Sequence, residues 1–244
     1  MAENSKFGDT QRPPFAWDSE LASERLFDLA VERYGGHRTN AITAIVAGFE
    51  NADWVFEDQR IIVEHKAIET EVTRTSKFQS EYERLITATP RAARSGYALG
   101  KAIQPFLAQI AKKANRQIRS TARRLNWEPH YGLLILSNRD FTSLPPGLIV
   151  SVLGDVLLRH YSEITAFIYI TDHYVDVPGS DLANILWSPQ YHPDAPSFLQ
   201  AFVNGFGTEF FKVLEEQFGP FDEHLTGDNP AWLEFARPIV QWRR

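Results

Sequence analysis

Apolar residues recur along this chain with two different periods, which predict where helices and strands begin and end. A spacing of three to four residues predicts helices at 19–34, 76–88, 102–125, 145–160 and 197–218. Short apolar runs predict strands at 41–49, 51–56, 61–66, 131–136 and 164–170. The order of helix, three strands, helix, strand, helix and strand predicts an α/β fold, with a mixed sheet and helices on both of its faces.

Polar and proline-rich stretches divide the chain into three predicted regions. Residues 1–17 are expected to form a flexible N-terminal arm, 18–175 the core, and 176–244 a helical C-terminal extension that packs on the core. Residues 90–100 are predicted to be a basic connection, and Pro105 is predicted to lie in the first turn of the helix that follows. The sequence has no internal repeat and no clear second domain.

The most informative polar residues interrupt two apolar strands on either side of a turn at 58–59. That turn sets a register in which Asp53 lies directly opposite Glu64. Like charges in directly opposed positions destabilise a sheet unless something neutralises them. Lys66 follows Glu64 by two residues, so it projects from the same face of the sheet. Two carboxylates and one ammonium group on one patch of sheet indicate a divalent cation with a water molecule beside it.

Composition narrows the classes of protein to consider. The 244 residues include no cysteine, which excludes disulfides, thiolate zinc sites and cysteine nucleophiles. The N-terminus lacks the apolar core of a signal peptide, and the longest apolar stretch, at 147–158, is too short to span a bilayer. We therefore expect a soluble, cytoplasmic protein without a membrane partner. A homodimer is one assembly that the sequence leaves open.

Positive charge is concentrated in one part of an acidic chain. The net charge is −6, yet the interval between Glu83 and Glu128 holds ten Lys and Arg residues and no acidic residue. A segregated basic block of this kind is typical of a surface that binds a polyanion. The alternative is a solvated helix face whose charges pair with acidic neighbours elsewhere in the fold, and the sequence favours the two about equally.

Together with the element order, Asp53 followed by Glu64-x-Lys66 resembles the PD-(D/E)XK nuclease superfamily, whose members share a restriction-endonuclease-like αβββαβ core. The resemblance covers residues 19–171, and Ala52 stands where the name of the motif has proline. It implies a magnesium-dependent nuclease that acts on DNA, with Mn²⁺ able to replace Mg²⁺. Asp53, Glu64 and the backbone carbonyl of His65 would bind the metal, and Lys66 would position the attacking water.

The resemblance also suggests further residues around this motif. Glu24 matches the glutamate that many members place near the metal from their first helix, although it also belongs to a stripe of exposed carboxylates. Gln117 matches a glutamine of RecB-like nucleases, but Thr121 replaces the tyrosine expected four residues later. The predicted nucleic-acid-binding residues are Lys101, Lys112, Lys113, Arg116, Gln117, Arg119 and Arg123.

Two other interpretations compete with the nuclease. The same fold can serve as a catalytically inactive module that binds nucleic acid or protein. In a purely structural α/β protein, the hairpin charges would form a surface ion cluster in which Lys66 balances one carboxylate. Residues 96–101 are one residue short of a P-loop and follow no strand, so we set aside a nucleotide site.

Overall fold

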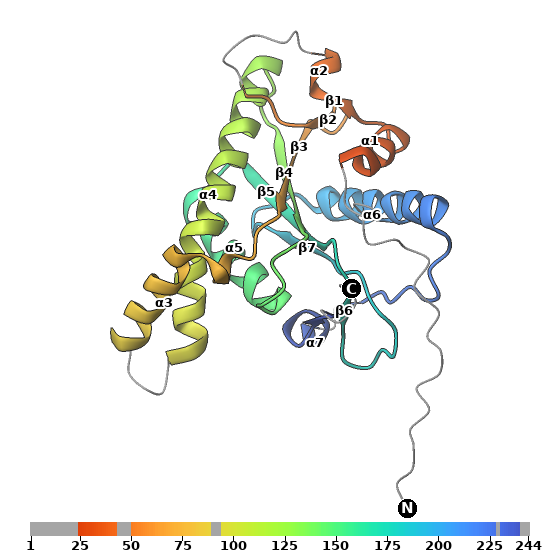
Figure 1. Cartoon of the computed structure of the whole chain (residues 1–244). Helices are drawn as coiled ribbons and strands as arrows, with labels where there is room; N and C mark the ends of the chain where they lie inside the picture. Colours follow the sequence, from red (N-terminus) through yellow and green to blue (C-terminus); the bar gives the residue numbers. More distant parts are fainter. Residues whose placement is uncertain (1–23, 43–49, 89–93, 228–229, 240–244) are drawn as a thin grey trace, which may run out of the picture.

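Six strands form one mixed sheet at the centre of the molecule, and helices cover both of its faces (Figure 1). The computed structural model describes residues 24–42, 50–88, 94–227 and 230–239. Across the sheet the strands are β1 (His37–Arg38), β2 (Trp54–Phe56), β3 (Ile61–Ile68), β4 (Tyr131–Asn138), β5 (Ile164–Thr171) and β7 (Trp187–Tyr191). β3, β4 and β5 run parallel, and the other neighbours are antiparallel. The predicted α/β class with a mixed sheet is therefore confirmed.

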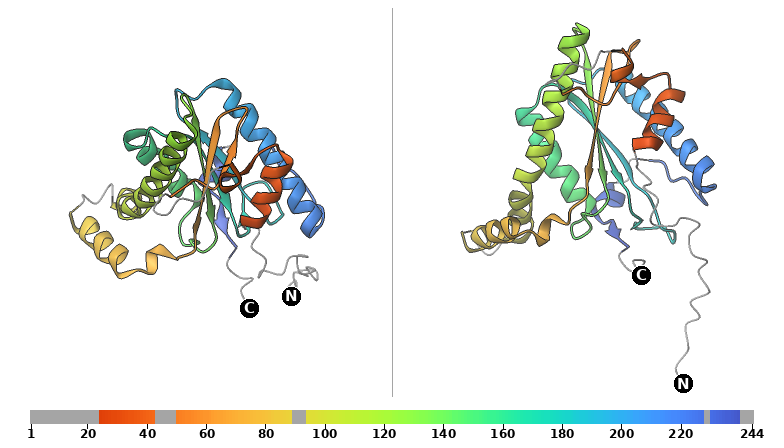
Figure 2. Two further views of the ribbon diagram at one scale, coloured as in Figure 1. Left: turned by 90° about the horizontal axis from the view of Figure 1, so that it is seen from above. Right: turned by 45° about the horizontal axis from the view of Figure 1, so that its top comes forward.

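Two layers of helices enclose the sheet, and each layer packs on its own hydrophobic cluster (Figure 2). α4 (Arg94–Leu125) and α5 (Pro146–His160) cover one face, and α1 (Glu24–Arg33) and α6 (Ser197–Phe218) cover the other. Because both faces are covered, a central strand needs apolar residues at every position. β4 follows this pattern over Leu133–Leu136, and its last two residues, Ser137 and Asn138, are polar but also buried.

The hairpin of β2 and β3 has the register that the sequence predicts. Trp54 pairs with Val63 and Phe56 pairs with Ile61, so Asp53 and Glu64 are the next residues outward along the two strands. Arg60 closes the turn with a positive φ of 52°. β3 lies between β2 and β4 in the interior of the sheet, which places Glu64 in the middle of the fold.

Two segments differ from the pattern that the sequence predicts. The prediction of a strand at 41–49 is wrong for its first two residues, because residues 41 and 42 belong to the short helix α2 (Thr39–Ile42). The rest of this predicted strand, 43–49, lies outside the described residues. The expected connection at 90–100 is also wrong from Arg94 onward, because α4 begins there. Pro105 consequently lies inside α4 rather than in its first turn. The early turns of α4 pack against α3 (Ser76–Ala88), and this contact stabilises them as helix.

The C-terminal region contributes directly to the sheet and to one of its helical layers. β7 pairs with β5 at the edge, and α6 packs against α1, where the rings of Phe27 and Phe210 stack 4.5 Å apart. The remaining elements are η1 (Val72–Arg74), β6 (Val175–Asp176), α7 (Pro230–Glu234) and β8 (Arg237–Pro238). β6 and β8 pair in a small second sheet.

Within the described ranges, every helix is too short or too polar to cross a lipid bilayer. The predicted arm at 1–17 lies outside these ranges.

Candidate metal site

Glu64 is a buried carboxylate on the face of β3 that α4 covers. Ile62 and Ile68 are two and four residues away from Glu64 on β3, so they project from the same face, and both belong to the hydrophobic cluster under α4. The Glu64 side chain is fully buried, and its Oε1 accepts a hydrogen bond from Nζ of Lys66. Its other oxygen, Oε2, has no hydrogen-bond partner among the residues that the structure describes. A buried carboxylate oxygen without a partner is costly, so this atom indicates a place for a cation or a water molecule.

Burial makes Glu64 difficult to ionise. Desolvation raises its pKa to about 8, and the negative charge of Asp53 adds to this shift. The ammonium group of Lys66 acts in the opposite direction, because it favours the charged carboxylate. A divalent cation beside Glu64 and Asp53 would have the same effect as Lys66, with twice the charge.

Asp53 immediately precedes β2, and the register of the hairpin places it next to Glu64. Its Oδ2 accepts a hydrogen bond of 2.7 Å from the backbone N–H of His65, which orients the carboxylate across the hairpin. Burial raises the pKa of Asp53, while the His65 hydrogen bond and the charge of Lys66 partly offset this effect. Asp53 and Lys66 thus interact with Glu64 electrostatically, and the three residues predicted as the site are brought together.

The side chain of His65 points to the opposite face of the sheet, as the alternation of β3 predicts. Its ring lies 4.9 Å from that of Phe27, and its Nε2 lies 2.8 Å from Oγ of Ser137. Desolvation lowers the pKa of His65 to about 3, so the ring is neutral at ordinary pH. Only the backbone carbonyl of His65 is therefore available as a metal ligand at this site.

Helix α4 holds the segment that leads into Asp53. Oγ1 of Thr121 accepts a hydrogen bond of 2.8 Å from the backbone N–H of Ala52. One turn earlier, Nε2 of Gln117 donates to the carbonyl oxygen of Asn51 at 3.1 Å. Its Oε1 is buried and has no partner in the described part of the chain. Gln117 therefore lies beneath the basic face of α4, bonded to the protein itself.

Thr121 was not among the residues predicted for the site. Gln117, Thr121 and Arg124 follow one another at intervals of four and three residues, which places them on one face of the helix. Arg124 completes the set with a hydrogen bond of 3.2 Å to Oδ1 of Asn51. The sequence signal for these contacts is a row of polar residues, four and three positions apart, on a helix that has a buried face. Such a row indicates that the helix forms hydrogen bonds with a neighbouring segment.

Glu24 approaches the site from α1 but is engaged with another residue. Its Oε1 accepts a hydrogen bond of 2.7 Å from Arg38, which also binds Asp28. Arg38 in turn lies over the ring of Trp54, 5.1 Å from its centre. The charge of Glu24 raises the pKa of Asp53, so Glu24 acts on the site electrostatically.

The predicted nucleic-acid-binding residues other than Gln117 are exposed along α4. Arg116 pairs with Glu50 at 2.6 Å, and Arg119 pairs with Glu163 at 2.9 Å. Lys112, Lys113 and Arg123 form no ion pair with a carboxylate in the part of the chain that the structure describes. Lys101 lies in an earlier part of α4, with its Nζ 5.9 Å from the ring centre of Tyr97. Pairing with acidic neighbours therefore accounts for only part of the basic block.

The donor set suits a hard cation. Two carboxylates and one backbone carbonyl match the preference of Mg²⁺ for oxygen ligands, with water and substrate completing the shell. Within the described residues, no group of three or more His, Cys, Asp and Glu side chains forms a metal cluster. Asp53 and Glu64 would thus be the two protein carboxylates of a site that needs further ligands from elsewhere. No protein-family model matches this chain, and no curated protein or solved structure matches it either.

Proposed function

We propose that this protein is a metal-dependent nuclease that hydrolyses phosphodiester bonds of DNA. The observation that carries the proposal is the unpartnered Oε2 of the fully buried Glu64, held beside Asp53 and Lys66. A purely structural hairpin gains nothing from burying such a carboxylate, whereas a metal site requires it. The resemblance of Asp53 and Glu64-x-Lys66 to the PD-(D/E)XK motif supports the same proposal.

Each residue of the site has a role that follows from its chemistry. Asp53, Glu64 and the carbonyl of His65 would hold Mg²⁺ or Mn²⁺, which lowers the pKa of bound water and offsets negative charge on the phosphate. Lys66 would hold the attacking water and stabilise the negative charge that develops on the phosphoryl oxygens. Water adds to phosphorus as the ester bond breaks, which leaves one phosphomonoester and one free hydroxyl group.

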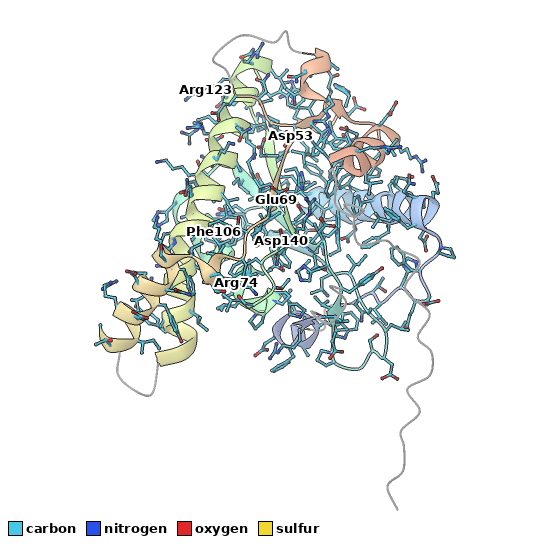
Figure 3. All side chains as sticks on the ribbon, viewed as in Figure 1. Asp53, Glu69, Arg74, Phe106, Arg123 and Asp140 are labelled. Atoms are coloured by element: carbon cyan, nitrogen blue, oxygen red, sulfur yellow. The ribbon has the colours of Figure 1, made fainter. Side chains whose placement is uncertain are left out.

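The basic face of α4 supports a polyanionic substrate. Lys112, Arg116, Arg119 and Arg123 recur at helical spacing, and a rise of 1.5 Å per residue makes this stripe about 16 Å long. Figure 3 shows Arg123 and Asp53 toward the same end of the molecule, whereas Arg74 lies far from them. The stripe can therefore follow a sugar-phosphate backbone that passes the metal site.

Cleavage assays test this proposal. Plasmid and single-stranded DNA should be cut in Mg²⁺ or Mn²⁺ but not in EDTA, and Lys66→Ala should abolish the cutting. Lys212→Ala is the matched control, because Lys212 is exposed on α6, which covers the other face of the sheet. Equal cleavage by wild type and Lys66→Ala would contradict the assignment of the site.

The alternative is an inactive module of the same fold that binds nucleic acid or protein. It is favoured by one observation, namely that Asp53 Oδ2 and Glu64 Oε1 already have partners within the protein. Calorimetric titration with Mn²⁺ separates the two functions. A nuclease should bind the ion in a manner that Asp53→Asn and Glu64→Gln abolish, whereas a binding module needs no metal affinity of this kind.

A further inference from the structure

Glu50 is an exposed carboxylate that lies among basic residues from two different elements. It precedes Asp53 by three residues, and its Oε2 lies 2.6 Å from Nη2 of Arg116 on α4. The hydrogen bond from Arg116 lowers the pKa of Glu50, and the charges of Lys113 and Lys66 lower it further. The carboxylate is thus held against the basic face of α4, three residues before the candidate metal ligand Asp53.

A carboxylate in this position resembles a bound phosphate in charge and in hydrogen bonding. Arg116 and Lys113 are separated by three residues, so both project toward the same side of α4. Lys113 also favours the ionised form of Glu64, which shows that its charge extends to the metal site. The Arg116 guanidinium that binds the Glu50 carboxylate, with Lys113 one turn away on the same side of the helix, is a set of cations of the kind that binds phosphate in proteins.

We infer that Arg116 and Lys113 form a phosphate subsite beside the candidate metal site, and that the carboxylate of Glu50 occupies this subsite when no nucleic acid is bound. The inference rests on the proposed function for the identity of the polyanion. A backbone phosphate next to the scissile one would displace Glu50 and take over its contact with Arg116. Glu50 therefore competes with the substrate for Arg116. A polyanion that does not displace Glu50 binds more weakly, because it gains no contact with Arg116.

Binding measurements without catalysis test this inference. The probe is a short fluorescein-labelled DNA oligonucleotide in EDTA, and the readout is fluorescence anisotropy at fixed salt. Glu50→Gln should tighten binding by about two- to fivefold, the effect expected when an exposed ion pair of this kind no longer competes. Asp155→Asn is the matched control, because it removes the same charge from an exposed ion pair with Arg159 on α5.

A double-mutant cycle with Arg116→Gln identifies the partner. In the Arg116→Gln background, Glu50→Gln should no longer tighten binding, since the competition that it relieves is absent. Equal effects of Glu50→Gln in both backgrounds, or an effect no larger than that of Asp155→Asn, would overturn the inference. Weaker DNA binding by Glu50→Gln in EDTA would also overturn it. Loss of Mn²⁺ affinity in this variant would overturn it as well and would make Glu50 a metal ligand instead.

The outcome for the nuclease proposal is read separately. If Glu50→Gln tightens binding as expected but no variant cuts DNA in Mn²⁺, the phosphate subsite stands and the inactive binding module is favoured. If the wild type cuts DNA and Glu50→Gln has no effect on anisotropy, the nuclease stands and the subsite is wrong. Failure of the wild type to bind the oligonucleotide at low salt would overturn the subsite, because phosphate contacts are strongest there.

Discussion

The backbone N–H of Ala52 donates a hydrogen bond of 2.8 Å to the side-chain hydroxyl of Thr121, 69 residues away in the chain. Both residues are buried, so neither group can exchange this contact for one with water. The bond fixes the residue just before Asp53 to the helix that carries the basic face. It therefore links the position of a candidate metal ligand to the surface proposed to bind the substrate.

Removing the hydroxyl of Thr121 should be costly. Thr121→Val leaves the buried N–H of Ala52 without an acceptor and should destabilise the protein by about 1–3 kcal/mol, as measured by urea denaturation. Thr121→Ser retains the hydroxyl and should cost less. If the contact also positions Asp53, metal-dependent cleavage should fall further in the valine variant than in the serine variant. Equal stability of the two variants would show that the hydrogen bond is not important.

Glu64 should make the metal-free protein less stable as the pH rises. Burial raises its pKa from an ordinary value of 4.5 to about 8, so the folded state holds the proton more tightly than the unfolded chain. Stability is then highest below the unfolded pKa and falls as the pH rises through the folded pKa, by as much as about 5 kcal/mol. Urea denaturation in EDTA across this range measures the slope. Glu64→Gln should remove it, and an unchanged slope in that variant would contradict the assignment.

A divalent cation should reverse this dependence on pH. Because the metal binds the ionised carboxylate, binding below the pKa of Glu64 must release a proton. Mn²⁺ should raise the midpoint of thermal unfolding of the wild type more at alkaline pH than at neutral pH. Calorimetry in buffers with different ionisation enthalpies counts the released protons. Glu64→Gln should show neither the stabilisation nor the proton release.

His65 should determine part of the stability on the acidic side. Burial lowers its pKa from an ordinary value of 6.5 to about 3, so the unfolded chain takes up a proton first as the pH falls. The stability that depends on a neutral His65 is fully present above the pKa of this residue in the unfolded chain. It is lost as the pH falls through the pKa of His65 in the folded protein. His65→Gln stays neutral and should flatten this slope in urea denaturation. Because the backbone carbonyl remains, Mn²⁺ binding should persist in this variant, and its loss would mean that the imidazole is the ligand.

The hairpin and the main helices could be predicted because their signals are local. The register that places Asp53 beside Glu64 follows from the two-residue period of the strands and the length of the turn. Residues 76–88 and 197–218 show a helical period that matches α3 and α6 in the structure. In contrast, β1 is only two residues long, and so short a strand has no measurable period.

The rest of the site depends on tertiary packing. The contacts of Gln117 and Thr121 with residues 51 and 52 join parts of the chain that are more than 60 positions apart. Arg116 and Glu50 are 66 positions apart, so the sequence offers no reason to pair them. The start of α4 was missed for the same reason, because a glycine-containing segment becomes helical through its contact with α3. Sequence identified the charged groups, and packing determines which of them meet.

A pair of glycines provides the sharpest test of the packing between β4 and the loop before β5. A Cβ on Gly132 would lie 1.9 Å from the carbonyl oxygen of Glu163, so that backbone would have to move. It cannot move freely, because the N–H of Glu163 is bound to Asn115 at 3.0 Å. Gly132→Ala should therefore destabilise the protein by at least about 1–3 kcal/mol, the usual cost of overpacking a core.

Gly154 is the control for this substitution. It lies inside α5, and the nearest atom to an added Cβ is a ring carbon of Phe167 at 4.0 Å, an ordinary contact. Gly154→Ala should stabilise the protein by about 0.5–1 kcal/mol, because alanine loses less conformational freedom than glycine in a helix. Urea denaturation of both variants measures the two effects, which should have opposite signs. Stabilisation by both alanines would mean that the loop at Glu163 can shift, and that the close approach of β4 to this loop is not required.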